Sequence, residues 1–303
     1  MIDFIGDIHG HADKLKALLA KLGYVFKNNS YTHPERKVLF AGDYIDRGPQ
    51  IRETLEIVKA MVDSGNAIAL MGNHEYNALC FYVTETKGGY LRNHSIKNII
   101  QHYQTLLQFH NRQSEYEAYL EWFKTLPLFY ETSNFRAVHA CWDDGNIAYL
   151  QTALHNNCFT DELIYQSVKK GSALNHAIDN TLKGKEILLP EGQYFTDSDG
   201  NKRTEIRIKW WEDPTKISYK NISVEAHEDL SAELINIDLL SNASFYAVDS
   251  KPVFFGHYWL KGNPVLYRNN ICCLDYSVAK NGNLVAYRFD GEEKLSNSKL
   301  VFV

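Results

Sequence analysis

Short apolar runs alternate with amphipathic stretches through the first quarter of the chain. Apolar runs that predict buried strands occupy residues 2–5, 38–41 and 67–71. Between them, apolar residues recur at helical spacing over residues 12–22 and 51–62, with charged residues in the intervening positions. Alternation of strands and helices predicts a parallel sheet covered by helices, and therefore an α/β fold.

The rest of the chain carries helical patterns first and strand patterns later. Helices are predicted over residues 95–109, 115–124, 161–170 and 173–182. One apolar face of the first of these helices is formed by Ile96, Ile99, Ile100, Tyr103, Leu106 and Leu107. Further strands are predicted over residues 136–139 and 253–255. Residues 271–274 and 284–289 are typical of an antiparallel pair joined by an Asn281-Gly282-Asn283 turn.

Residues 150–245 depart from this alternation. We expect one domain, residues 1–303, in which residues 150–245 form an inserted, substrate-facing segment with helices and a hairpin. The hairpin is predicted from residues 193–197 and 202–211 around an Asp199-Gly200-Asn201 turn. Its second arm alternates, with Arg203, Arg207 and Lys209 on the face opposite Ile206 and Ile208. That basic face could grip substrate phosphate, and it could equally be the solvated side of a surface hairpin.

Composition limits the class of protein. The chain has 303 residues, of which 45% are hydrophobic and 23% are charged, which is typical of a folded globular domain. A net charge of −5 argues against an extended nucleic-acid partner. The five cysteines are odd in number and form no CxxC pair, so a reducing compartment is expected. The first motif begins at residue 6, and no long uncharged apolar run occurs, so we expect a cytoplasmic protein without a membrane span.

Three glycine-containing motifs follow directly after the three predicted N-terminal strands. They read Gly6-Asp7-Ile8-His9-Gly10, Gly42-Asp43-Tyr44-Ile45-Asp46-Arg47-Gly48 and Gly72-Asn73-His74-Glu75. The carboxyl ends of parallel strands meet at one edge of a sheet, so these side chains are expected to converge there. Carboxylate, amide and imidazole groups are suitable ligands for divalent metal ions, and glycine permits sharp turns. The pattern therefore predicts a metal site.

The motifs resemble the signature of the calcineurin-like metallophosphoesterases. They are most similar to the branch that contains the serine/threonine protein phosphatases and the symmetrical diadenosine tetraphosphate hydrolases, which carry GDxHG, GDxVDRG and GNHE blocks. Two later histidines, His139 after a predicted strand and His257 after Gly256, complete the pattern. The resemblance implies a four-layer α/β/β/α sandwich with a helical and hairpin insert.

The resemblance also implies a site for two divalent metal ions. Asp7 and His9 would bind the first ion, and Asp43 would bridge to the second. The second ion would be completed by Asn73, His139 and His257. Manganese is the first choice, with iron or zinc as alternatives, because the ligands are nitrogen and oxygen atoms without a thiolate.

Catalytic roles follow from the same resemblance. A hydroxide shared by the two ions would attack phosphorus in line. His74 would protonate the leaving oxygen, and Asp46 would hold the protonated form of His74. Arg47, with Asn73, would bind the phosphoryl oxygens, and Arg203 and Arg207 are further substrate-binding candidates by charge alone.

Several residues keep a second interpretation. Asp7 and Asp43 could be helix caps, and His139 and His257 could be core histidines. Asp275 could orient a ligand histidine or could be a turn residue. Four tryptophans could stack a base or pack in the core: Trp142, Trp210, Trp211 and Trp259. The other histidines, His102 among them, are assigned to surface or helix positions.

The functional expectation is a two-metal phosphoesterase that acts on a phosphorylated substrate. Phosphomonoesters, including phosphoserine or phosphothreonine in proteins, are the first candidate, and a dinucleoside polyphosphate is the alternative. The chain reads His139-Ala140-Cys141-Trp142-Asp143 where the protein phosphatases usually carry a His-Gly-Gly block. A third possibility is a catalytically inactive binding protein, although all the expected ligands are present.

Overall fold

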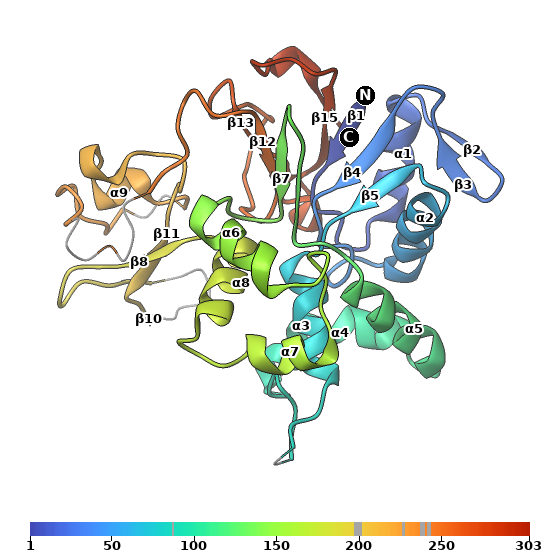
Figure 1. Ribbon diagram of the computed structural model, residues 1–303, viewed down its shortest axis with the longest axis horizontal. Helices are drawn as coiled ribbons and strands as arrows, with labels where there is room; N and C mark the ends of the chain where they lie inside the picture. Colours follow the sequence, from blue (N-terminus) through green and yellow to red (C-terminus); the bar gives the residue numbers. More distant parts are fainter. Residues whose placement is uncertain (87, 197–201, 226–227, 237–239, 241–243) are drawn as a thin grey trace.

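Two β-sheets lie face to face in this chain, and helices flank them on the outside (Figure 1). The computed structural model describes residues 1–303 except for 87, 197–201, 226–227, 237–239 and 241–243. The architecture is the expected α/β/β/α sandwich, in which the two sheets enclose one apolar layer and the helices enclose another.

The first sheet has the order β14-β15-β1-β4-β5, with β16 paired to β15. Strands β1, β4 and β5 are parallel, as the alternation of strands and helices predicted. Two amphipathic helices, α1 (Ala12–Lys21) and α2 (Ile51–Asp63), connect them and bury their apolar residues against the sheet. The strands of this sheet are β1 (Ile2–Ile5), β4 (Lys37–Phe40), β5 (Ala67–Ala69), β14 (Asp275–Tyr276), β15 (Asn283–Phe289) and β16 (Leu300–Phe302).

The second sheet has the order β13-β12-β7-β6. Strand β12 (Val253–Phe255) is parallel to both β13 (Ile271–Cys273) and β7 (Arg136–Val138), and β6 (Phe129–Glu131) is antiparallel to β7. Strands β7 and β12 were both predicted from their apolar runs. They end next to His139 and His257, so the second sheet carries those two histidines toward the first.

Side-chain alternation along the strands separates the two apolar layers. Phe4 of β1 and Phe254 of β12 point between the sheets, where their rings stack with centroids 3.7 Å apart. Their chain neighbours Ile5 and Phe255 point outward under the helices. Strands β1 and β12 are therefore buried on both faces, which explains why most of their residues are apolar.

The pairing predicted for the end of the chain is wrong. Residues 271–274 and 284–289 do form strands, but β13 belongs to the second sheet and β15 to the first. The antiparallel partner of β15 before the turn is β14, which follows β13 directly. The chain crosses from one sheet to the other between Cys273 and Asp275, and an apolar run does not show to which sheet it belongs.

The helices of the structure agree in large part with those predicted from the sequence. The predicted helices are present as α4 (Ile96–Gln108), α5 (Gln113–Lys124), α7 (Asp161–Ser167) and α8 (Ala173–Lys183). Among the longer helices, α3 (Asn73–Tyr82) and α6 (Asp144–Ala153) were not predicted. Helix α3 begins inside the third motif, so Asn73 and His74 lie on a helix and not on a strand end. The shorter helical elements are α9 (Tyr219–Ile222), η1 (Pro214–Lys216), η3 (Val278–Lys280) and η4 (Asn297–Lys299).

Helix α4 turns its polar side toward the protein. Its exposed residues include Ile96, Ile100, Tyr103 and Leu107, whereas His102 and Thr105 are its buried residues. An amphipathic helix normally buries its apolar stripe. The periodicity of the sequence identified this helix correctly, but the face that it turns inward is the opposite of the usual one.

Short strands within the described part of residues 150–245 pack around a small apolar cluster of their own. Strand β9 (Phe195–Thr196) pairs with β10 (Lys202–Arg203), as the hairpin prediction required, and the predicted turn at 199–201 lies outside the described residues. The second arm does not continue on that partner. Residues 205–207 form β11, which pairs with β8 (Glu186–Leu188). Ile206 and Ile208 of this arm are buried, as the alternation predicted. One more hairpin, β2 (Val25–Lys27) with β3 (Ser30–Thr32), projects beside α2.

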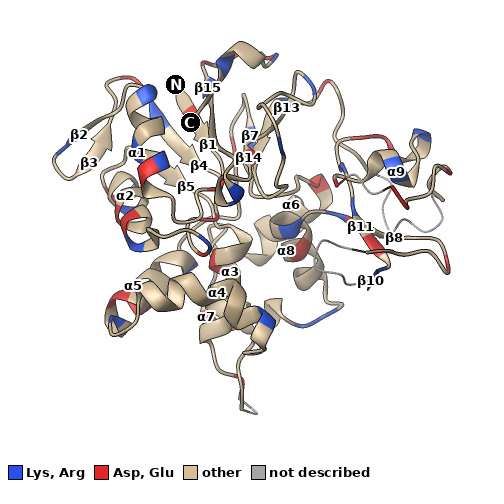
Figure 2. Cartoon of the chain, turned by 180° about the vertical axis from the view of Figure 1, so that it is seen from behind, with Lys and Arg blue, Asp and Glu red and all other residues tan. Residues whose placement is uncertain are grey.

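Charged residues of both signs are mixed on the surface. Figure 2 shows basic and acidic residues together on α2, which carries Arg52 and Lys59 beside Glu53 and Glu56. All five cysteines are free. Within the described part of the chain, no helix is both long and apolar enough to cross a bilayer.

Candidate metal centre

The predicted ligands meet where the carboxyl ends of the two sheets face each other. Asp7, His9 and Asp43 lie in loops after β1 and β4, and Asn73 is the first residue of α3 after β5. His139 and His257 follow β7 and β12 of the opposite sheet. All six side chains are buried, and none exposes more than 7% of its surface. Groups separated by up to 250 positions in the sequence thus share one buried site.

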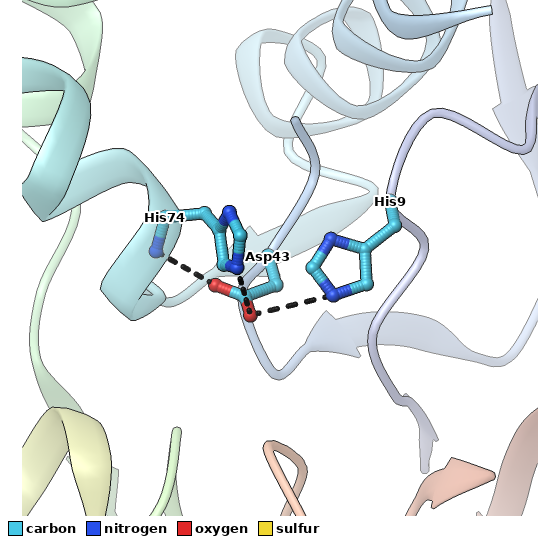
Figure 3. A group of neighbouring side chains, drawn as sticks. All are labelled: His9, Asp43 and His74. Carbon is cyan, nitrogen blue, oxygen red and sulfur yellow. Dashed lines mark hydrogen bonds and ion pairs between the residues drawn. The ribbon is translucent and has the colours of Figure 1, made fainter. Parts of the chain in front are cut away.

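The Asp43 carboxylate lies at the middle of this site. Its Oδ2 atom is 3.6 Å from His9 Nε2, 3.5 Å from His139 Nε2 and 3.9 Å from His74 Nε2. Figure 3 shows His9 and His74 on either side of this carboxylate, and its Oδ1 accepts the backbone N–H of His74 at 3.0 Å. Two groups with metal-binding spacing share Asp43, one with His9 and His74 and the other with His139 and His257.

Asn73 contacts both of the later histidines, and Asp7 contacts one of them. Asn73 Oδ1 lies 3.0 Å from His139 Nε2 and 2.8 Å from His257 Nδ1. Asp7 Oδ2 accepts the backbone N–H of His257 at 3.0 Å. Asp7 and Asp43 are not the N-caps of the helices that follow them, because those positions are His11 for α1 and Gln50 for α2.

Three buried polar atoms in this site lack a hydrogen-bond partner among the described residues: Asp7 Oδ1, His9 Nε2 and His257 Nε2. A buried acceptor without a partner costs about 1–3 kcal/mol. A divalent cation would be a partner for all three, because carboxylate oxygen and imidazole nitrogen are metal ligands. The donor set therefore fits the divalent ions for which the motifs were expected to provide ligands.

The histidines at this centre differ in the direction in which their pKa values are shifted. Burial and then the charge of His74 lower the pKa of His9 to about 3. Burial and then the charge of Arg207 lower the pKa of His257 well below its usual value. Burial also opposes the charged form of His139, but the Asp43 carboxylate outweighs it and raises the pKa of His139 to about 10. His9 and His257 are thus neutral imidazoles, the form that binds metal ions.

The carboxylates respond to the same surroundings. Burial raises the pKa of Asp7 well above its usual value, and the charge of Asp275 adds to that effect. Burial also opposes ionisation of Asp43, but the charges of His139 and His74 hold the pKa of Asp43 well below its usual value. Two carboxylates in one buried site repel each other, and a cation between them would relieve this repulsion.

The site-forming loops adopt a backbone that non-glycine residues rarely use. The φ angles are +45° at His9, +55° at Asp43, +66° at Asp46, +68° at Arg47 and +73° at His257. Each such residue costs of order 1–3 kcal/mol and persists only where its surroundings impose it. A cluster of these angles at one site indicates that the loops are shaped for the side chains that they present.

Glu75 holds the loop that carries Asp43. One carboxylate oxygen accepts the backbone N–H groups of Asp43 at 2.9 Å and Gly72 at 3.0 Å, and the other accepts that of Tyr44 at 2.8 Å. Glu75 was quoted in the third motif without a role. Its position beside Asn73 and His74 was the signal, but a support role becomes visible only when the distant loop is in place.

Two glycines make room for the carboxylates. A Cβ atom at Gly72 would lie 2.2 Å from Asp43 Oδ1, and one at Gly256 would lie 1.9 Å from Asp7 Oδ1. Any side chain at either position would displace the carboxylate. The glycines before Asn73 and His257 are therefore required by close approach of these groups.

His74 and Asp46 are in direct contact, as the resemblance implied. His74 Nδ1 lies 2.5 Å from Asp46 Oδ2. Burial opposes protonation of His74, but the charges of Asp43 and Asp46 raise its pKa. His74 follows Asn73 directly, and both residues lie in the first turn of α3.

His102, which was assigned only to a surface or helix position, is buried beside Asp46. His102 Nδ1 lies 2.7 Å from Asp46 Oδ1, and Thr105 Oγ1 donates to the same oxygen at 2.5 Å. Both residues come from the inward polar face of α4. No motif includes them, and the apolar periodicity of α4 suggested the opposite face.

Arg47 lies on the ring of Trp259 at the edge of the site. The guanidinium carbon is 3.7 Å from the ring centroid, and the ammonium nitrogen of Lys280 is 4.4 Å from a ring centroid of the same tryptophan. Trp142, Trp210 and Trp211 are buried in the core, so only Trp259 remains near the site with partial exposure. Asp275 contacts no ligand histidine through a described hydrogen bond, and instead accepts the backbone N–H of Trp259 at 2.7 Å.

The two arginines proposed from charge alone lie in different surroundings. Arg207 of β11 is half-buried, its charge reaches His257, and its Nε is a buried donor without a partner among the described residues. Arg203 is exposed on β10. The structure therefore brings Arg207 toward the centre and leaves Arg203 on the surface of the insert.

The fold and the donor set together define a metal-dependent phosphoesterase scaffold. The family model described as calcineurin-like phosphoesterase matches residues 1–258. The chain belongs to this family, and the family implies divalent metal ions.

Curated relatives are bacterial tetraphosphatases. The asymmetrical bis(5'-nucleosyl)-tetraphosphatase PrpE of Oceanobacillus iheyensis is 31% identical over 140 residues, which are 46% of this chain and 54% of that protein. The chain thus spans about half the length of that relative. The symmetrical bis(5'-nucleosyl)-tetraphosphatase of Marinomonas is 24% identical over 305 residues, which are 96% of this chain and 94% of that protein.

Among solved structures, a protein serine/threonine phosphatase from Saccharomyces cerevisiae with similarity to human phosphatase PP5 is 12% identical. It aligns with a TM-score of 0.49 over 100% of this chain and 78% of that chain.

Proposed function

We propose that this protein is a two-metal phosphoesterase. The main support for this proposal is that buried ligand-type groups from both sheets surround Asp43. Three of their atoms have no other partner among the described residues. The proposed ligands are Asp7, His9, Asp43, Asn73, His139 and His257. Manganese is the first choice and iron or zinc the alternatives, because the donors are nitrogen and oxygen atoms.

Divalent ions bound there would supply Lewis-acid charge that activates water and neutralises the phosphoryl group. Arg47 is proposed to bind the phosphoryl oxygens. Its guanidinium lies on the ring of Trp259. Burial lowers the pKa of Arg47, and the carboxylates of Asp43 and Asp46 oppose that effect. A preformed guanidinium fork binds two phosphoryl oxygens without further ordering.

His74 is proposed as the general acid. Its Nδ1 is occupied by Asp46, which leaves Nε2 as the nitrogen that faces Asp43 and the reaction space. Protonation is favoured by the two carboxylates, so a proton on Nε2 is available for the leaving oxygen. The competing role for His74 is metal ligation, because Nε2 shares one donor group with His9 and Asp43. Asp46 would orient the ring in either case.

A dinucleoside polyphosphate is proposed as the substrate in preference to a phosphoprotein. Support comes from the tetraphosphatase names of the curated relatives, one of which aligns over 96% of this chain. Phosphomonoesters remain the second candidate, because the three N-terminal motifs also resemble those of protein phosphatases. Residues 150–245 are proposed to face the substrate, which is supported by the proximity of Arg207 to His257.

Metal-dependent turnover tests the proposal directly. Chelator-treated protein, reloaded with manganese, iron or zinc, would be assayed with diadenosine tetraphosphate, a phosphoserine peptide and p-nitrophenyl phosphate. We expect restored hydrolysis, with the highest kcat/KM on the dinucleotide. A preference for the phosphopeptide would reverse the order of the two substrates, and no turnover of any substrate with any metal would overturn the function.

The matched variants are Asp43→Asn and Asp13→Asn. Asp43 is buried at the centre, whereas the Asp13 side chain is 72% exposed on α1. Only the first is expected to lose metal and turnover.

A further inference from the structure

Asp46 receives hydrogen bonds from two imidazoles on opposite sides. One oxygen lies 2.5 Å from His74 Nδ1, and the other lies 2.7 Å from His102 Nδ1 and accepts the Thr105 hydroxyl at 2.5 Å. The Thr105 hydroxyl in turn accepts the backbone N–H of Asp46 at 3.0 Å. Side chain and backbone of Asp46 are thus both held by α4.

Tyr116 of α5 contacts the far side of His102. Its hydroxyl lies 2.7 Å from His102 Nε2. Tyr116 is buried, and burial and then the charge of Asp46 raise the pKa of its hydroxyl well above the usual value, so the hydroxyl keeps its proton at neutral pH. The Asp46 carboxylate only accepts hydrogen bonds, so the ring proton of His102 lies on Nδ1, and Nε2 then accepts the Tyr116 hydroxyl.

The orientation of α4 supports a functional role for the contact between His102 and Asp46. The helix exposes Ile96, Ile100 and Leu107 to water while its polar side faces the motif loops. That polar side also contributes Gln108, whose Oε1 accepts the N–H of Ile51 and whose amide donates to the carbonyl of Gly48. Packing alone would favour the opposite face. With its polar side turned inward, α4 places hydrogen-bonding groups against the loop that carries Asp46.

We propose that His102, fixed by Tyr116, is a positioning residue that orients the Asp46 carboxylate toward His74. This inference rests on the proposed function and deepens it, because it adds a buried chain Tyr116–His102–Asp46–His74 behind the proposed general acid. Asp46 adopts a left-handed backbone, which persists only where its surroundings impose it, and contacts from α4 support both its backbone N–H and its carboxylate. His102 provides that support without contact with substrate.

The test compares substrates with good and poor leaving groups, using the manganese-loaded protein. His102→Leu is expected to lower kcat about 10-fold or more on phenyl phosphate, which needs a protonated leaving oxygen, with a much smaller loss on p-nitrophenyl phosphate. KM and metal content are expected to stay within about 2-fold of wild type, since the ligands and Arg47 are unchanged. Equal losses on both esters would overturn the positioning role.

Two conservative variants separate positioning from folding. His102→Asn retains an N–H donor and is expected to recover most of the loss on phenyl phosphate. Tyr116→Phe removes one hydroxyl and is expected to show the same leaving-group dependence in milder form, whereas Tyr119→Phe, a buried tyrosine on the same helix, is the control. If Tyr116→Phe and Tyr119→Phe behave alike on both esters, the proposal fails.

A readout without turnover distinguishes this inference from the proposed function. The Nδ1 proton of His74 in its short hydrogen bond to Asp46 should give a low-field proton NMR signal that exchanges slowly with water. In His102→Leu this signal is expected to broaden or move upfield, and in Tyr119→Phe to stay. An unchanged signal in His102→Leu would overturn the inference even if the enzyme is active. A lost signal in an enzyme without activity would support it independently of the function.

Discussion

The backbone N–H of His257 donates to the carboxylate of Asp7 at 3.0 Å, across 250 positions of the chain. This bond joins the loop after the first strand of one sheet to the loop after β12 of the other. The two sheets are therefore connected at the proposed metal centre itself, so that changes at the centre should affect the stability of the whole protein as well as activity.

Metal removal is expected to destabilise the protein. The buried carboxylates of Asp7 and Asp43 repel each other, and a bound cation stabilises the folded state by mass action, by about 2.7 kcal/mol per site at 100 times Kd. Differential scanning fluorimetry with EDTA and then with excess manganese should show a lower Tm that metal restores. An identical Tm in both conditions would argue that no ion binds at this centre.

His74 and His9 should respond differently to the same substitution. We expect His74→Asn to keep both metals and to lose far more turnover on phenyl phosphate than on p-nitrophenyl phosphate, because only the first needs a general acid. His9→Asn should lose metal, because His9 Nε2 is a buried atom that has no other partner among the described residues. Elemental analysis with steady-state kinetics decides, and metal loss in His74→Asn would make His74 a ligand instead.

Glu75→Gln should weaken the fold at the Asp43 loop. Each carboxylate oxygen accepts backbone N–H groups, so the amide of glutamine would have to direct its own N–H groups at donors. A loss of about 1–3 kcal/mol in the free energy of unfolding is expected from urea titration. Glu121→Gln is the control, since the Glu121 side chain is 72% exposed and should change stability by less than about 0.5 kcal/mol. Similar losses in both variants would contradict a special role for Glu75.

Substitution of Trp259 should act through Arg47. The ring holds the guanidinium at 3.7 Å, and a cation–π contact of this kind contributes about 1–2 kcal/mol. Trp259→Leu is therefore expected to lower kcat/KM by about 5- to 30-fold without loss of metal, while Trp259→Phe keeps much of the activity. If leucine and phenylalanine variants have equal kcat/KM, the ring does not position Arg47.

Local patterns predicted most of the longer strands and helices, although not α3 and α6, and the resemblance of the motifs supplied the proposed ligands. The runs at 2–5, 38–41 and 67–71 predicted β1, β4 and β5, because a strand buried on both faces is mostly apolar. The exception is Asp3 of β1, which is buried with Arg36 as its partner. The motifs after these strands could be assigned because carboxyl ends of parallel strands share an edge. Membership in the calcineurin-like phosphoesterases follows the same residues, since the family model begins at residue 1 and reaches His257.

Helix α4 marks the limit of such reasoning. Its apolar period predicted a helix correctly, but the side turned inward depends on partners for His102, Thr105 and Gln108 that lie far away in the sequence. The sheets to which β13 and β15 belong could not be predicted locally either, because an apolar run does not show whether two strands share a sheet.

The amino-acid sequence alone determined which residues form strands, where glycine permits a turn and which residues can bind a metal ion. Each of these depends on residues within a few positions of one another. The location of Arg207 near His257, the support of Asp46 by His102 and the closure of the Asp43 loop by Glu75 arise from contacts between distant segments. Such contacts are decided when the two sheets and their helices pack, because the free energy of each one depends on burial and on partners that no single segment contains.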